Sequence, residues 1–116
     1  MENNKKDIYK ISIFPVNLEN PTMITKLSTE ESSKVMYCQA ESNYTFIHFE
    51  PERLLVKCKT LKAVQEELDK NHFMRVHSKY LINVNYIKEV SEDRHHVKLI
   101  NGKVLPIARR RRLIFG

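Results

Sequence analysis

The stretch "FMRVHSKYLINVNYI", residues 73–87, raises the central question about the fold, because a polar cluster interrupts two apolar runs. Short apolar runs on either side of a turn are typical of paired strands. The cluster holds Arg75, His77, Ser78 and Lys79, where a plain hairpin would turn on Gly or Asn-Gly. The stretch therefore predicts two strands whose rigid frame presents a polar patch suited to recognition.

A structural role for these polar residues stays open. A lone histidine is more often a satisfied structural residue than a ligand or a base, and His77 could hold the loop by bonding a main-chain carbonyl. Asn83 and Asn85 could be turn residues, because Asn readily bonds its own backbone. The residues alone do not choose between holding the turn and contacting a partner.

Length and composition are typical of one soluble globular domain. The chain has 116 residues, 41% of them hydrophobic and 29% charged, which allows one core and argues against disorder. No run approaches the roughly 18 apolar residues of a membrane-spanning helix. The first ten residues have no apolar segment behind their lysines, so no secretory signal is expected. We therefore expect a cytoplasmic protein.

Enzyme chemistry, metals and cofactors are not expected. No Ser or Cys nucleophile has a nearby His with an orienting acid, and two glycines cannot make a Gly-rich phosphate loop. Cys38 and Cys58 each lie in an apolar, strand-like run, which favours reduced thiols packed as small hydrophobic side chains. The adjacent His95 and His96 would point to opposite faces of a strand, which makes a poor metal site.

Positive charge is concentrated in the second half of the chain. Residues 1–50 hold five basic and seven acidic residues, a net charge of −2. Residues 51–116 hold 15 basic and seven acidic residues, a net charge of +8, and the two parts sum to the +6 of the whole chain. Such a basic half suggests a polyanionic partner, with nucleic acid before an anionic membrane. We interpret the polar patch as facing a nucleic-acid backbone and base edges.

The remaining pattern predicts a β-rich fold, an all-β domain or sandwich, with one clear helix. Leu61, Val64 and Leu68 form a helical stripe, with Thr60 as N-cap and Asn71 as terminator. Asn101-Gly102 predicts a type I′ hairpin, and the polar residues 28–34 predict a loop. The expected strands are residues 8–14, 34–40, 44–49, 54–59, 73–76, 80–84, 86–90, 96–100 and 104–107.

Two further segments could contact a polyanion. Arg109 to Arg112 are four consecutive guanidiniums, which repel one another unless anions or water screen them. The run follows a strand, and Leu113, Ile114 and Phe115 could pack back and fix its direction; the alternative is a frayed basic terminus. Asn43 lies in a turn with Glu41 and Ser42, and it could read base edges or only form the turn.

These polar sites, in this order, resemble the LytTR family of bacterial DNA-binding domains. The resemblance covers about residues 24–113 and rests on four motifs in sequence: "MYCQAESNYTFIHF", "TLKAVQEEL", "FMRVHSKYLINVNYI" and "VLPIARRRR". It implies an elongated arrangement of small antiparallel β-sheets with one short helix. It also implies that loops, and not a recognition helix, bind double-stranded DNA at direct repeats and regulate transcription.

The resemblance assigns roles to three loops. The turn Ser42-Asn43-Tyr44 would enter one major groove, and Ser78 and Lys79 would lie at the minor groove or its phosphates. Arg109 would read bases in the second major groove, Arg110 and Arg112 would contact phosphates, and His77 would be structural or phosphate-facing. Two departures affect this assignment: the family's basic-then-Ser order is reversed at Ser78-Lys79, and Ala108 replaces a common Ser.

The resemblance also predicts the organisation of the chain and its partners. Residues 1–23 form an N-terminal extension that is partly strand, and residues 24–116 form the DNA-binding domain. An extension of this size is too short for a receiver domain, so we expect a stand-alone response-regulator-like protein. A membrane inhibitor protein or a second copy on an adjacent repeat would be further partners. The alternative is a protein-interaction module whose basic C-terminal tail docks on an acidic partner or a membrane surface.

Overall fold

A computed structural model describes residues 29–51 and 53–116, which form two antiparallel sheets with little helix. The expected strand at residues 8–14 and the N-terminal extension lie outside this part of the chain. The described elements are α3 (Thr29–Ser32), β1 (Val35–Glu41), β2 (Tyr44–Phe49), β3 (Arg53–Lys57), α4 (Leu61–Glu67), β4 (Phe73–His77), β5 (Tyr80–Asn83), η2 (Val84–Tyr86), β6 (Ile87–Val90), β7 (His96–Leu99), β8 (Val104–Pro106) and η3 (Arg109–Phe115), where η marks a 3₁₀ helix. The β-rich prediction is confirmed.

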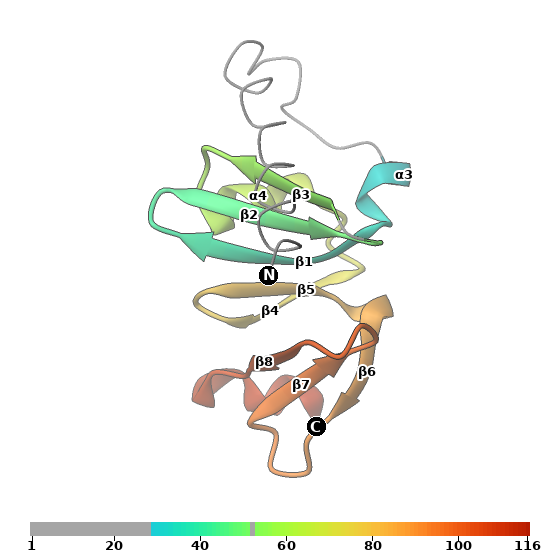
Figure 1. The fold of residues 1–116 in the computed structure, drawn as a ribbon. Coiled ribbons are helices and arrows are strands. Elements are labelled where there is room, and N and C mark those ends of the chain that lie inside the picture. The colour runs from blue at the N-terminus through green and yellow to red at the C-terminus, as the bar shows by residue number, and fades with distance from the viewer. Residues whose placement is uncertain (1–28, 52) are drawn as a thin grey trace, which may run out of the picture.

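The first sheet has five strands in the order β3-β2-β1-β5-β4, and the second has three in the order β6-β7-β8. Figure 1 shows the second sheet beyond β4. Strand β1 lies in the centre of the first sheet, where Tyr37 pairs with His48 of β2 and with Ile82 of β5. A central strand is covered on both faces, which explains why its sequence is nearly continuously apolar.

Two hydrophobic cores lie on opposite faces of the five-stranded sheet. Leu81 and Ile82 are successive residues of β5, so their side chains point to opposite faces and enter different cores. The first core packs this sheet against Leu61 and Val64 of α4 and against Leu68 just after it, which together are the predicted stripe. The second packs it against the three-stranded sheet through Val97, Leu99, Leu105 and Ile107.

The helix prediction is correct at its start and too long at its end. The Thr60 hydroxyl accepts the Ala63 N–H at 3.2 Å, as expected of an N-cap. The helix ends at Glu67, and Leu68 is already extended, so Asn71 does not terminate it. Within the polar stretch expected to be a loop, the structure places the one-turn helix α3.

The hairpin between β7 and β8 is not a type I′ turn. Gly102 has φ 92°, but Asn101 is not among the described residues with positive φ, and a type I′ turn needs two. The Gly102 N–H donates to the Leu99 carbonyl at 2.8 Å, and the Asn101 side chain accepts the Lys103 N–H at 3.0 Å. The side-chain bond of Asn101 therefore stabilises a longer loop.

The two cysteines have different environments. Cys38 is buried in the first core, as expected, and burial raises the pKa of its thiol far above the ordinary value. Cys58 is exposed just beyond β3, so the expectation that it packs as a small hydrophobic side chain is wrong. The strand that was predicted to continue to residue 59 ends at Lys57.

Candidate nucleic-acid interface

The first predicted loop is the two-residue turn between β1 and β2. Glu41 and Tyr44 pair across its base, which leaves Ser42 and Asn43 as the turn. Ser42 has φ 57°, in the left-handed region. Ser42, Asn43 and Tyr44 are all exposed, so the structure presents the three predicted residues at one tip.

The second predicted loop is the turn between β4 and β5. His77 pairs with Tyr80, and Ser78 and Lys79 form an exposed turn between them. The Nδ1 atom of His77 accepts the Lys79 N–H at 3.1 Å, so His77 holds its own turn, but through a main-chain N–H and not through the carbonyl that was expected. Because Nδ1 is the acceptor, a neutral His77 carries its proton on Nε2, which becomes the ring's donor toward a partner.

These two turns lie side by side. Strand β1 pairs with β5, and the Ala40 N–H donates to the Lys79 carbonyl at 2.9 Å. Between the two turns, the Lys79 ammonium lies 3.9 Å from the Glu41 carboxylate. The same carboxylate accepts a hydrogen bond from the Gln39 amide at 2.9 Å. The pairing of strands far apart in sequence therefore brings the first and second predicted loops together.

The arginine run is an ordered 3₁₀ helix tied to the edge of the five-stranded sheet. The Ala108 N–H donates to the Val76 carbonyl of β4 at 2.8 Å, immediately before η3 begins. Arg109 and Arg110 are exposed, whereas Arg111 and Arg112 are half-buried. The Arg112 Nε is buried without a hydrogen-bond partner among the described residues.

The apolar residues after the arginines do not all pack back. Phe115 is half-buried against the second core, as expected. Leu113 is 86% exposed and Ile114 46% exposed, so the expectation that they fix the direction of the run is wrong. The main-chain bond of Ala108 and the packing of Phe115 hold η3 instead.

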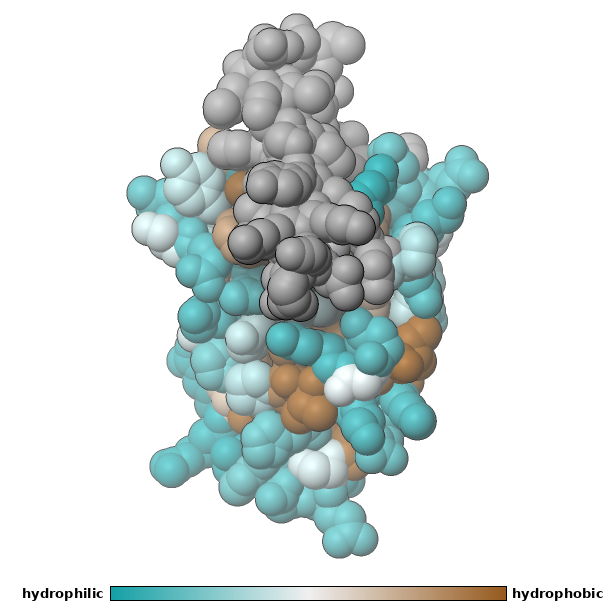
Figure 2. All heavy atoms as spheres, viewed as in Figure 1, coloured by the Kyte–Doolittle hydropathy of each residue, from teal (hydrophilic) through white to brown (hydrophobic). Residues whose placement is uncertain are grey.

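The three predicted segments lie along one side of the molecule. In Figure 1 the β1–β2 turn, the β4–β5 turn and the start of η3 follow one another down the left side. Where Figure 2 shows described residues, the face toward the viewer is largely hydrophilic, with apolar side chains in separate patches. The side with the three segments presents exposed polar turns and two exposed arginines, which suits a polar ligand better than an apolar one.

A row of rings connects the second turn to the interior of the sheet. His77 lies 5.8 Å from Tyr80, which lies 6.5 Å from Tyr37, and Tyr37 stacks on His48 at 4.2 Å between ring centroids. These four residues come from β4, β5, β1 and β2, which are neighbours in the sheet. We call them the aromatic row. The row connects the second turn through ring contacts to β5, β1 and β2.

An ion pair between β3 and α4 is linked by a hydrogen bond to the strand that follows the first turn. Lys57, only 5% exposed, donates to Glu67 of α4 at 2.8 Å, and Lys59 donates to the same carboxylate. The Lys59 carbonyl accepts the hydroxyl of Thr45, the residue after Tyr44, at 2.7 Å. Burial by itself raises the pKa of Glu67, but the two lysines outweigh burial and lower it.

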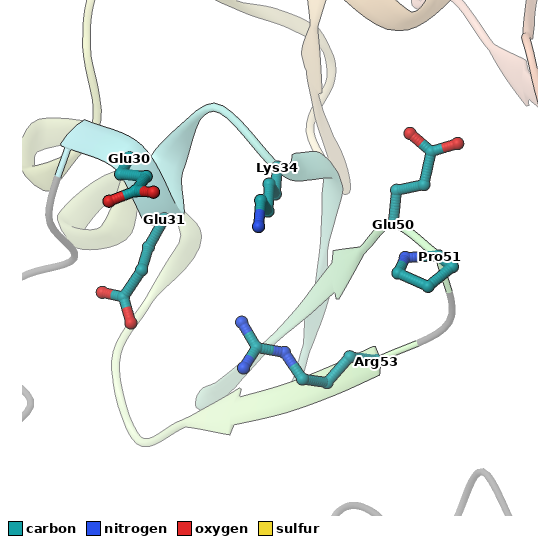
Figure 3. A pocket seen from close by; sticks show the side chains of 6 residues that line it. All are labelled: Glu30, Glu31, Lys34, Glu50, Pro51 and Arg53. Atoms are coloured by element: carbon teal, nitrogen blue, oxygen red, sulfur yellow. The ribbon is translucent and has the colours of Figure 1, made fainter.

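The opposite end of the five-stranded sheet has a different character. Glu30, Glu31, Lys34, Glu50, Pro51 and Arg53 line a hollow of about 410 Å³ there. Figure 3 shows Lys34 and Arg53 pointing toward its centre and Glu50 pointing away. The lining holds three carboxylates and two cations, so this end lacks the positive excess of the arginine run.

Neither a metal cluster nor a membrane-crossing helix is found where the structure describes the chain. No group of three or more His, Cys, Asp or Glu side chains within residues 29–51 and 53–116 could hold a metal ion. No described helix is both long and apolar enough to cross a membrane.

Comparison with known proteins identifies the family. Residues 25–113 match the family model of the LytTr DNA-binding domain. A search of curated proteins found no match. A solved structure of the LytTr DNA-binding domain of a Bacillus cereus protein, described as a methyl-accepting/DNA response regulator, has a TM-score of 0.65 and 29% identity, covering 72% of this chain and 79% of that chain. With most of its length matched, the chain belongs to the LytTR family of DNA-binding domains, which is not a family of enzymes.

Proposed function

We propose that the protein regulates transcription by binding specific double-stranded DNA through three segments on one side. Ser42, Asn43 and Tyr44 enter one major groove, and Arg109 reads bases in the next. Ser78 and Lys79 lie at the minor groove between them. His77 also lies there, and Arg110 and Arg112 contact phosphates. The single observation that supports this proposal is the placement of the three segments along one side of a rigid scaffold.

The chemistry of each segment suits its proposed role. An exposed guanidinium such as that of Arg109 can donate two parallel N–H groups to the O6 and N7 atoms of guanine. The Nε2–H of a neutral His77 and the ammonium of Lys79 are donors that suit phosphate oxygens. The amide of Asn43 can pair with adenine in a major groove.

A second copy on an adjacent repeat is part of the proposal. One copy presents two segments for major grooves, so two copies on one face of the duplex would sit a whole number of helical turns apart. Direct repeats need the copies to face the same way. The number of copies bound to a one-repeat and a two-repeat duplex tests this directly.

The test begins with selection of duplexes from a randomised pool. Binding of a selected duplex and of a scrambled duplex is then measured between low and moderate salt. Each phosphate contact should contribute about −0.9 to the slope of log K against log salt. A docking module for acidic proteins or membranes would prefer no duplex sequence. Failure to enrich any sequence would refute specific DNA binding.

A further inference from the structure

Arg75 contacts the protein itself and does not belong to the exposed patch in which the sequence placed it. Its Nε donates to the His77 carbonyl at 2.9 Å, and its Nη2 donates to the Ser78 carbonyl at 2.8 Å. Its Nη1 lies 3.3 Å from the Oε1 acceptor of Gln65 in α4. The paired Nε and Nη2 groups, which could otherwise fork onto a phosphate, are therefore used to hold the β4–β5 turn.

The backbone of the same residue holds the arginine segment. The Arg75 carbonyl accepts a hydrogen bond from Arg111 Nη1 at 3.4 Å. The next carbonyl along β4, that of Val76, accepts the Ala108 N–H at 2.8 Å. Strand β4 is the last strand in the order of the five-stranded sheet, so its outer edge is available for these bonds. Two successive residues of β4 thus fix the start and the third residue of η3.

We propose that Arg75 is a positioning residue that fixes the Ser78-Lys79 turn and η3 relative to each other. This inference rests on the proposed function, because it assigns the two segments to one DNA-binding unit. Its side chain sets the path of the turn, and its carbonyl orients Arg111. Recognition of a duplex requires both segments to keep their spacing within a fraction of an ångström.

The arrangement places two like charges close together. Burial, followed by the charge of Arg111, lowers the pKa of Arg75. The two guanidiniums are therefore held near each other by the carbonyl acceptors against their own repulsion. A lysine at position 75 keeps the positive charge but cannot fork onto two carbonyls, which makes Arg75→Lys the informative variant.

The first experiment compares Arg75→Lys with a matched control, Arg53→Lys. Arg53 is exposed at the far end of the sheet, where it covers the Phe49 ring at 4.2 Å. We expect Arg75→Lys to weaken binding of the selected duplex about tenfold, because misplaced contact groups lose affinity. Binding of the scrambled duplex and the salt slope should not change, and the control should match the wild type. Unchanged affinity for the selected duplex in a folded variant overturns the proposal.

A test of direct DNA contact uses Arg75→Gln, which removes the charge. If Arg75 touched a phosphate, the salt slope would become shallower by about 0.9. We expect no such change. A shallower slope would assign Arg75 to the duplex and remove its positioning role.

A second readout needs no DNA, and it separates this inference from the proposed function. Hydrogen exchange is measured at the amides of Lys79 and Ala108, which are bonded in the two segments. We expect Arg75→Lys to speed exchange at both amides, while Arg53→Lys speeds neither. Faster exchange at Lys79 alone contradicts the link to η3. A wild type without duplex preference refutes the proposed function and leaves this exchange result standing.

A milder variant covers the case in which Arg75→Lys does not fold. Gln65→Met removes the acceptor on α4 and leaves both carbonyl contacts of Arg75 in place. It should speed exchange at both amides to a smaller extent. No effect at either amide would show that the Gln65 contact does not contribute; Arg75→Gln, which removes the paired donors, then decides, and unchanged exchange at both amides in that variant overturns the proposal.

Discussion

The two residues of the first turn differ in what they contribute: Ser42 sets the backbone conformation, and Asn43 presents its side chain to solvent. Ser42 has the left-handed φ of 57°, whereas Asn43 beside it does not have a positive φ and is exposed. The turn conformation therefore depends on position 42. Position 43 is available for a ligand.

We predict that Asn43→Ala changes DNA discrimination without lowering stability. The free energy of unfolding should stay within about 0.5 kcal/mol of the wild type, as for other exposed positions. The melting temperature and the ratio of selected to scrambled duplex binding are the two measurements. A large fall in melting temperature would identify Asn43 as a turn former.

Arg109 and Arg112 should differ in what they contribute to binding. We predict that Arg109→Ala lowers discrimination between the selected and scrambled duplexes by about 1–3 kcal/mol, the value of a bidentate base contact. Arg112→Ala should weaken both duplexes equally and reduce the salt slope by about 0.9. Titrations of both duplexes at several salt concentrations provide the comparison. An equal loss of discrimination in the two variants would contradict this division.

At the scale of elements, Glu67 ties α4 to Lys57 at the end of β3, the strand that pairs with β2. We predict that Glu67→Gln lowers the free energy of unfolding by about 3 kcal/mol, because it leaves the buried Lys57 ammonium without this counter-charge. Urea unfolding measures the change, and Glu66→Gln, an exposed neighbour in the same helix, is the control. Similar losses in both variants would show that the ion pair is not the cause.

The elements that the sequence predicts well are those with a periodic apolar pattern. The stripe of Leu61, Val64 and Leu68 located α4, and the apolar run of β1 located a buried strand. Helix α3 has no such stripe, since its four residues are polar, and it could not be found by periodicity. The arginine run likewise has no periodicity, so its 3₁₀ helix had no signal in the sequence. Asn101 misled because it supports the hairpin with its side chain and not with a positive φ.

At the scale of the whole molecule, the burial of His48 makes stability depend on pH. His48 of β2 is mostly buried on Tyr37, and burial, followed by the charge of Lys103 between β7 and β8, lowers the pKa of His48 from 6.5 to about 4. The folded state therefore holds His48 neutral over a range in which the unfolded chain binds a proton. Stability should fall as the pH decreases from about 6.5 to about 4.

We predict that this loss reaches about 3 kcal/mol for the wild type and is much smaller for His48→Phe. The aromatic replacement keeps a ring against Tyr37 and removes the titrating group. Urea unfolding at pH 7, 5.5 and 4 measures the difference between the two proteins. Equal pH dependence in both would assign the acid sensitivity to other groups.

The layout of the candidate site could be predicted only in part from the sequence. The three polar segments stand out along the chain, and the structure brings two of them together because β1 pairs with β5. That pairing joins residues about forty positions apart, and no local pattern specifies it. The positioning role proposed for Arg75 has no sequence signal either: its carbonyl partners His77 and Ser78 are local, but a sequence pattern does not show which way a guanidinium turns, and Gln65 and Arg111 lie on other elements.

The tyrosines of the aromatic row provide an intrinsic fluorescence signal close to the second turn. The chain contains five tyrosines and no tryptophan, so tyrosine emission is not masked. Tyr80 stands next to His77 at the edge of the turn, and Tyr37 lies behind it in the core. A ligand bound at the two turns would lie against the exposed Tyr44 and next to the half-buried Tyr80, so a change in tyrosine emission would report binding by the unlabelled protein.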